Sequence, residues 1–285
     1  MKKNVLAAGT ALFLLSISLS FAVRHAQGQV NDSVGATTDA NFVAPEVFQA
    51  AGPSPNSIQS VVTEYRAALG GQNNGNDGAH NDGGRREINW DGGSPANQTT
   101  TISPNPFAGF QISRGALFTT PDGTGFVQAP PSGLASGAVF NNPNYATIFT
   151  AFSPSRLFSP IGSNVTDIDF FVPGGGAPAT TRGFAAVFAD VDQPDGSGPG
   201  EKRGNRKAST LIEYFGVHGE LFFSSFVPAS PGDRSLWFFG VVFPDASIAH
   251  VRITSGNVAP GPDDAGKQDV VMMDDFIYGE PAGIE

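Results

Sequence analysis

The sequence has no cysteine, which excludes disulfide bonds and a cysteine-linked lipid anchor. Basic residues are also scarce: 16 Lys and Arg stand against 26 Asp and Glu, for a formal charge of −10 and a pI near 4.7. Nucleic-acid binding depends on Lys and Arg meeting phosphates, so this balance argues against a nucleic-acid partner. It argues equally against binding to anionic membrane surfaces.

Long apolar runs are missing too, except for one at the N-terminus. Two lysines precede an uncharged, mostly apolar stretch at residues 5–21, and small residues follow it. This pattern predicts a secretory signal peptide over residues 1–28, with cleavage after Ala22 or after Gly28. A retained membrane anchor is the weaker alternative, because a span needs about 20 apolar residues. The mature protein is therefore expected to be secreted, either extracellular or periplasmic, with no membrane contact after cleavage.

The signal segment contains three Lys and Arg residues and no acidic residue, so its removal lowers the formal charge from −10 to −13. Such acidity suits solubility outside the cell and suits divalent cations. Export without any cysteine fits a bacterial protein better than an animal one. Stability must then come from an ordinary hydrophobic core, for which 24 phenylalanines provide material.

Residues 29–53 start polar, become mixed and carry no periodic pattern, so a loosely ordered segment is predicted there. Residues 54–285 are predicted to form a single β-sandwich domain that includes one amphipathic helix at residues 55–69. Pro55 suits the first turn of that helix, and Gly70 suits its end. Apolar residues at helical spacing predict that the helix packs onto a sheet: Ile58, Val61, Val62, Tyr65 and Leu69.

Beyond the helix, short apolar runs alternate with turns rich in Gly, Pro and Asp, which is typical of an all-β sandwich or barrel. Residues 236–243 are apolar on both faces of the predicted strand, so another element must cover the outer face. The helix and loops such as 141–145 are expected to do so. The predicted strands are residues 86–90, 114–119, 125–128, 146–152, 165–172, 183–190, 209–215, 220–227, 235–243, 248–254 and 269–278.

Aspartates at strand ends suggest a metal site. Asp190 and Asp192 end one predicted strand, and Asp275 lies in an apolar strand, where a carboxylate is costly unless it is paired or bound to metal. Calcium prefers such oxygen ligands, so a structural calcium ion at these three residues is one prediction. The alternative is that they bond backbone amides and loop lysines. The loop at residues 73–78 is similar to a calcium loop but has Gly84 where an EF-hand requires Glu.

Catalysis has little support, because the four histidines stand alone and no nucleophile, zinc or phosphate-loop motif occurs. Glu213 and Glu220 flank a predicted hairpin and could form the carboxylate pair of a glycosidase, but surface charges are the simpler interpretation. Trp90 ends a predicted strand beside a glycine-rich loop, where its ring could be exposed for stacking on a sugar. It is the candidate ligand-binding residue, and packing in the core or at its rim is the alternative.

Two stretches carry a resemblance: residues 67–92, which end in Gly-Arg-Arg-Glu-Ile-Asn-Trp-Asp-Gly, and residues 209–281. Together they resemble a family of uncharacterised exported bacterial proteins, which implies no activity. The ending Asp-Asp-Phe-Ile-Tyr-Gly at 274–279 is similar to the last strand of jelly-roll modules that bind carbohydrate or anchor surface proteins. Some relatives with that ending continue into a membrane-sorting tail, and this chain lacks one up to Glu285, so release is expected.

The sequence therefore favours an exported, jelly-roll-like β-sandwich with one N-terminal helix. Its leading function is a non-catalytic binding or surface-matrix module that binds polysaccharide or an envelope component and is stabilised by calcium. Two alternatives stay open: a hydrolase or lyase that acts on polysaccharide, and a structural envelope protein without a small ligand. A face lined with polar and aromatic side chains would favour binding, and two carboxylates across a cleft would favour the enzyme.

Overall fold

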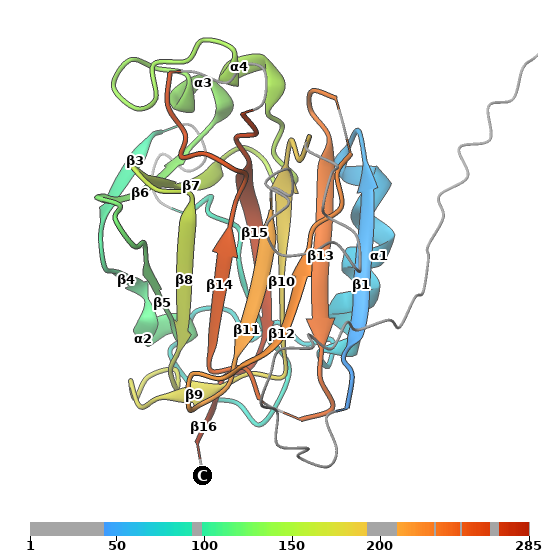
Figure 1. Ribbon diagram of the computed structural model, residues 1–285. Helices are drawn as coiled ribbons and strands as arrows, with labels where there is room; N and C mark the ends of the chain where they lie inside the picture. Colours follow the sequence, from blue (N-terminus) through green and yellow to red (C-terminus); the bar gives the residue numbers. More distant parts are fainter. Residues whose placement is uncertain are drawn as a thin grey trace, which may run out of the picture.

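Two antiparallel sheets pack face to face, and helices cover the outer side of one of them (Figure 1). The all-β sandwich expected from the sequence is therefore confirmed. Within the part of the chain that is described, no helix combines the length and apolarity needed to cross a membrane. The predicted signal peptide lies outside that part. The computed structural model describes residues 43–92, 99–192, 210–230, 232–245, 247–262 and 268–284.

The strands form one sheet of eight, one of six and a small pair. In order across the sheet, the eight are β1 (Glu46–Gly52), β13 (Leu236–Val242), β10 (Gly183–Ala189), β15 (Met272–Gly279), β7 (Leu157–Ile161), β6 (Gly125–Ala129) and β3 (Thr101–Pro104), with β2 (Arg85–Ile88) paired to β15. The six are β12 (Leu221–Phe226), β11 (Leu211–Phe215), β14 (His250–Thr254), β8 (Val165–Phe170), β5 (Ala116–Thr119) and β4 (Phe107–Phe110). The pair is β16 (Ala282–Gly283) with β9 (Ala179–Thr180). The helices are α1 (Pro55–Ala68), α2 (Gln111–Arg114), α3 (Pro131–Leu134) and α4 (Tyr145–Ile148).

The strands from β7 onward wind as a jelly roll. The chain crosses between the sheets repeatedly, so that β7, β15, β10 and β13 are neighbours in one sheet and β8, β14, β11 and β12 are neighbours in the other. This arrangement of two interleaved Greek keys joins strands that are distant in the sequence. It confirms the jelly-roll character expected from the C-terminal strand.

The eight-stranded sheet contributes to two hydrophobic layers, which explains why β13 is apolar on both faces. Phe239 and Val241 point between the two sheets and join the larger core. Leu236 and Phe238 point the opposite way and join a second core beneath α1, α3 and α4. Side chains alternate along a strand, so a strand buried on both sides must be apolar at every position.

Helix α1 covers the edge of the eight-stranded sheet where β1 and β13 pair, as predicted. Ile58, Val62 and Tyr65 are fully buried in the second core. The Tyr65 hydroxyl lies 3.3 Å from a carbonyl oxygen of β13. Gly183 and Gly240 make room for this ring: a Cβ on Gly240 would lie 2.9 Å from Tyr65 Cε2, and one on Gly183 would lie 3.1 Å from the hydroxyl oxygen. Glycine in these strands therefore permits close helix–sheet packing.

Two sequence-based predictions are wrong. Part of the segment predicted to be loosely ordered, 29–53, forms β1 at the edge of the eight-stranded sheet. Its pattern is not periodic because Val47 packs against one core and Phe48 against the other. Residues 146–152 do not form a strand; α4 occupies their start, and Tyr145 and Phe149 pack against each other in the helical layer. Six strands, β1, β3, β4, β7, β9 and β16, were not predicted.

Candidate functional site

Trp90 is a core residue, so the prediction that it presents an exposed stacking surface is wrong. Its side chain is 1% exposed and stacks on Phe158 with a centroid separation of 3.7 Å. Phe118 and Phe276 meet it edge-on at 5.2 Å. The backbone of Trp90 has φ of 62°, a left-handed conformation that turns the chain after β2 and directs the ring inward.

The other aromatic residues with a polar tip are also withdrawn from the surface. Tyr145 and Tyr278 are buried, and Trp237 is half-buried against the larger core. The Tyr145 hydroxyl lies 2.9 Å from the carbonyl oxygen of Gly261, and the Tyr278 hydroxyl lies 3.0 Å from that of Arg114. None of the Trp and Tyr residues in the described ranges therefore offers a flat, open ring to a ligand.

The three aspartates of the predicted calcium site do not form one group. Asp192 Oδ1 accepts a hydrogen bond from the backbone of Gly232 at 2.9 Å, whereas Asp275 lies inside β15. The register pairs the last residue of β10 with Met272, so Asp190 lies beyond the start of β15 and Asp275 lies three residues into that strand. Across the described ranges, no group of three His, Cys, Asp or Glu side chains is arranged to hold a metal ion. That the protein binds calcium stays a prediction.

Asp275 instead belongs to an aspartate cluster, which consists of Asp91, Asp274, Asp275 and Ser153. The Ser153 hydroxyl lies 2.5 Å from Asp275 Oδ1, 3.3 Å from Asp274 Oδ1 and 3.2 Å from Asp91 Oδ2. Asp274 Oδ2 also accepts hydrogen bonds from the backbone amides of Phe152 and Ser153. Burial raises the pKa of Asp274 well above its usual value, and repulsion from Asp275 adds to the rise. Burial raises the pKa of Asp275 as well.

We expect the substitution Asp275→Asn to change stability, relative to wild type, more favourably at neutral pH than at acid pH. A carboxyl whose pKa is raised by folding stabilises the fold fully below its unfolded pKa of about 3.9, and this contribution is lost as pH rises through the folded pKa. Each unit of raised pKa corresponds to about 1.4 kcal/mol. Thermal unfolding between pH 4 and pH 8 should therefore show a variant-minus-wild-type difference that grows in favour of the variant with pH.

The exposed helix residue Glu64 provides a control, since Glu64→Gln should leave the pH profile unchanged. The test depends on the difference in stability between variant and wild type at each pH. The pH profile of the wild type alone is not sufficient, because the pKa of Asp167 is lowered and its effect on stability has the opposite sign. A constant difference between Asp275→Asn and wild type over this pH range would contradict the raised pKa of Asp275.

The outer face of the six-stranded sheet carries a row of charged residues over three neighbouring strands. Glu213 of β11 lies opposite Arg252 of β14, which lies opposite Asp167 of β8. Arg252 donates two hydrogen bonds to Asp167, from Nε to Oδ1 at 2.7 Å and from Nη2 to Oδ2 at 2.9 Å. Burial alone would raise the pKa of Asp167, but hydrogen bonds from His250 and Arg252 hold it below its usual value.

A second row lies two residues along the same strands. Phe215 of β11 is opposite His250 of β14, which is opposite Asp169 of β8. His250 Nδ1 lies 2.8 Å from Asp169 Oδ1, and its Nε2 lies 3.2 Å from Asp167 Oδ1. The Phe215 and His250 rings meet edge-on at 5.2 Å. Burial would lower the pKa of His250, but its two aspartate partners outweigh that effect and raise the pKa to about 9.

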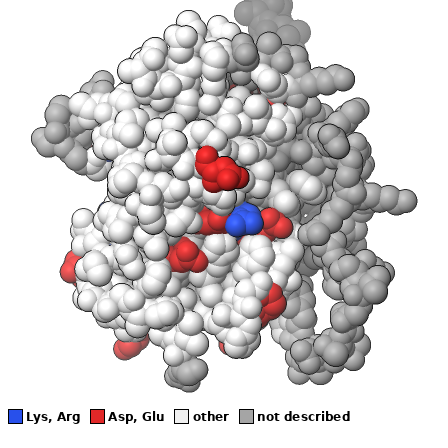
Figure 2. Space-filling model, turned by 60° about the vertical axis from the view of Figure 1, so that its left-hand side comes forward, with Lys and Arg blue, Asp and Glu red and all other residues white. Residues whose placement is uncertain are grey.

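These six side chains form the outer-face cluster, and they lie on the sheet face that no described helix covers. Figure 2 brings this side of the molecule forward and shows a basic side chain with acidic side chains around it, within a mostly uncharged surface. Asp169 and Arg252 keep about two fifths of their side-chain surface exposed, at 42% and 41%. Charged groups that are fixed by partners and still accessible can bind a polar ligand without reorganising. The outer-face cluster is Glu213, Arg252, Asp167, Phe215, His250 and Asp169.

The chemistry of the outer-face cluster suits binding more than catalysis. With a pKa of about 9, His250 carries a proton at neutral pH and is not available as a general base. Glu213 and Glu220 do not form a carboxylate pair, which agrees with the simpler interpretation of both as surface charges. Glu213 is opposite Ser224 in the hairpin, and Glu220 lies past its turn, where it accepts a hydrogen bond from the His218 amide. The signal that could have identified the cluster is the alternation Asp-x-Asp at 167–169 and His-x-Arg at 250–252.

No protein-family model matches the chain, and no curated protein matches its sequence. Among solved structures, the K2 cleaved adhesin domain of Lys-gingipain is similar with a TM-score of 0.30 and 12% sequence identity. The alignment covers 63% of this chain and 99% of that domain. A similarity this weak supports no conclusion about function, which therefore depends on the geometry of the chain itself.

Proposed function

We propose that this protein is an exported, non-catalytic binding module that binds polysaccharide through the outer-face cluster of its six-stranded sheet. Export rests on the signal pattern at residues 1–28. Binding rests on one observation: two adjacent rows of side chains, five of them polar and one the ring of Phe215, lie on the sheet face that the helices leave open.

The arrangement of the cluster suits a sugar polymer. Neighbouring strands are about 4.8 Å apart and alternate residues on one strand are about 6.8 Å apart, so the two rows make a grid of donors and acceptors. Sugar hydroxyls both donate and accept hydrogen bonds, so Glu213, Arg252 and Asp169 can each bind one. Phe215 adds a half-buried apolar contact beside them. Binding of this kind relies on hydrogen bonds, because the described Trp and Tyr rings are withdrawn from the surface.

The partners within the cluster prepare it for binding. Arg252 and His250 are both anchored on Asp167, which is itself nearly buried, so their positions are fixed before a ligand arrives. Preorganisation reduces the entropy that binding would otherwise cost. The protonated His250 adds a second positive charge, beside that of Arg252, among three carboxylates, which limits repulsion within the cluster.

The experiment is a glycan array probed with the mature protein, with calcium and with chelator. We expect retention of a subset of polysaccharides, and an effect of calcium would test the predicted calcium dependence separately. The double variant Glu213→Gln, Asp169→Asn should weaken retention by about tenfold or more, since each lost charge-assisted hydrogen bond contributes about 1.5–3 kcal/mol.

The matched control is Glu64→Gln on the exposed side of α1, which removes one carboxylate far from the cluster and should bind as wild type does. Melting temperatures show that all three proteins are folded. The proposal fails if the wild type retains no polysaccharide, or if the double variant retains polysaccharide as well as the wild type.

A further inference from the structure

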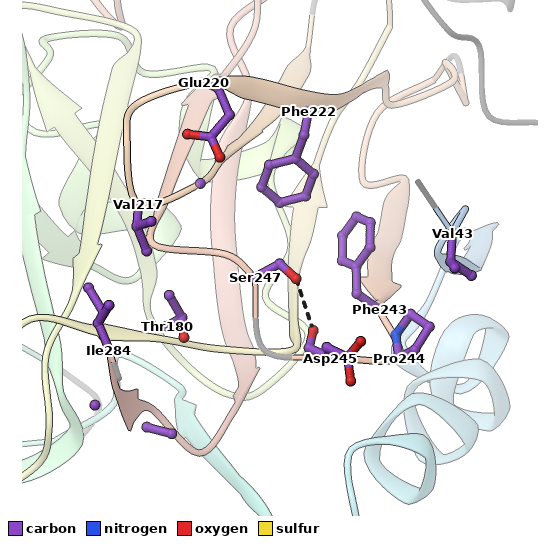
Figure 3. A pocket seen from close by; sticks show the side chains of 13 residues that line it. Val43, Thr180, Val217, Glu220, Phe222, Phe243, Pro244, Asp245, Ser247 and Ile284 are labelled. Atoms are coloured by element: carbon purple, nitrogen blue, oxygen red, sulfur yellow. Dashed lines mark hydrogen bonds between the residues drawn. The ribbon is translucent and has the colours of Figure 1, made fainter. Parts of the chain in front are cut away.

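A cavity of about 830 Å³ opens at the end of the sandwich where β16 and β9 pair. The turn between β11 and β12 forms one wall, the segment that follows β13 forms another, and the C-terminal residues close a third (Figure 3). Its volume lies within the range of about 300–1,000 Å³ that is usual for ligand sites. It is separate from the outer-face cluster, with which it shares no lining residue.

Large hydrophobic residues that are exposed gather at the walls of the cavity. Five large hydrophobic residues in the described ranges are exposed, and three of them line this cavity: Val43, Val217 and Ile284. Phe222 and Phe243 add a pair of rings that meet edge-on at 5.1 Å. Exposed apolar residues that stand singly on a surface are common, whereas exposed apolar residues that gather in one cavity indicate an interaction site.

The charge of the cavity is negative. Glu220 and Asp245 line it, and no lining residue in the described ranges is Lys or Arg. The Glu220 side chain lies over Gly216, where an added Cβ would be 2.1 Å from Glu220 Oε1, and Oε2 accepts the His218 amide at 3.0 Å. Figure 3 shows Glu220 directed toward the cavity beside the ring of Phe222. Carboxylates and phenyl faces both attract cations.

We propose that this cavity binds a basic peptide segment of a partner protein. A Lys or Arg side chain of the segment lies near Glu220 and the ring of Phe222, and apolar neighbours of that basic residue pack against Val217 and Ile284. Charge complementarity selects this occupant: the cavity repels anions, and its apolar walls suit hydrocarbon stems better than sugar hydroxyls. The inference is independent of polysaccharide binding at the outer-face cluster.

The test measures binding of a fluorescent, amidated eight-residue peptide of alternating Lys and Leu by fluorescence anisotropy. Two matched probes replace every Lys by Glu or every Leu by Ser. We expect binding of the Lys–Leu probe alone, with weaker binding at 300 mM than at 50 mM salt. Glu220→Gln and Asp245→Asn should each weaken it about threefold to tenfold, and Val217→Ser should weaken it as well.

The control variant is Asp122→Asn, which neutralises an aspartate of the β5–β6 turn outside the cavity and should bind the probe as wild type does. Equal affinity of Glu220→Gln, Asp245→Asn and wild type for the probe would overturn the inference. So would concentration-dependent dimerisation, seen by light scattering, that Val217→Ser abolishes, since the cavity would then serve a second copy of the chain. Glycan retention by Glu220→Gln separates this inference from the proposed function, because it should equal that of wild type.

Discussion

Replacing Trp90 by Ala is expected to destabilise the protein by about 3–5 kcal/mol, the usual cost of removing a large aromatic side chain from a core. The ring lies between the two sheets, stacked on Phe158 and met edge-on by Phe118 and Phe276. Its loss leaves a cavity at a point where both sheets and the end of β2 meet. For a domain of this size the melting temperature should fall by roughly 6–20 °C.

The control is Trp90→Phe, which keeps an aromatic ring and removes the indole N–H, which has no hydrogen-bond partner among the described residues. Loss of a buried, unpaired donor offsets part of the lost packing, so this variant should melt much closer to wild type. A melting temperature of Trp90→Ala within 2 °C of wild type would contradict the core position. If a stable Trp90→Ala protein lost polysaccharide retention, the result would instead support the hypothesis that Trp90 stacks on a sugar.

Replacing Arg86 by Met is expected to be equally damaging, at about 3–5 kcal/mol, because it leaves the buried carboxylate of Glu280 without its cation. Arg86 is fully buried, and its Nε and Nη2 lie 2.5 Å and 2.7 Å from the two carboxylate oxygens of Glu280. Its remaining N–H groups donate to backbone oxygens of Asn74 and Gly75 and to the carboxylate of Asp77, among others. One guanidinium therefore joins β2, the 73–83 loop and the C-terminal segment.

A second variant separates the cost of leaving the Glu280 carboxylate without a cation from the cost of losing the hydrogen bonds of Arg86. Adding Glu280→Gln to Arg86→Met removes the uncompensated carboxylate and keeps one of its two acceptor oxygens, which receive the Asn74 side-chain amide and the Asn81 backbone amide respectively. We expect the double variant to recover part of the lost stability in denaturant unfolding. If the loss of stability in the double variant equals the sum of the losses in the two single variants, Arg86 and Glu280 are not coupled and other contacts hold the loop.

Regular apolar patterns in the sequence predicted the elements that pack against another layer along their whole length. The stripe from Ile58 to Leu69 indicated a helix because its residues recur at helical spacing, and the structure buries that stripe. The all-apolar run at 236–243 indicated that a second layer must cover β13, and α1 does so. In both cases one packing surface buries residues along the whole length of the element, so the burial appears in the sequence as a regular apolar pattern.

Single residues that meet distant neighbours could not be placed in this way. Trp90 stood at a strand end beside glycines, a context that suits either a core or a surface ring, and only its contacts with β7 and β15 decide between them. Asp275 was rightly expected to need a partner within an apolar strand, but that partner is Ser153, 122 residues earlier in the chain. Sequence spacing carries no information about such pairs.

The two stretches on which the resemblance to exported bacterial proteins depends contain several structural residues. Arg86 and Glu280 form the buried ion pair, and Trp90 fills the core. Asp91 and Asp274 belong to the aspartate cluster. The second stretch also contains four of the six residues of the outer-face cluster, which are Glu213, Phe215, His250 and Arg252. The two stretches therefore combine residues that hold the sandwich together with residues of the candidate site.

Backbone amide hydrogen exchange, with and without the polysaccharide that the array retains best, tests the central claim most directly. If the outer-face cluster is the binding site, protection should increase in β8, β11 and β14 and should be unchanged in α1. The double variant Glu213→Gln, Asp169→Asn should show no such increase at the same ligand concentration. Protection that appears only around the end cavity or over α1, with β8, β11 and β14 unaffected, would contradict binding at the open sheet face.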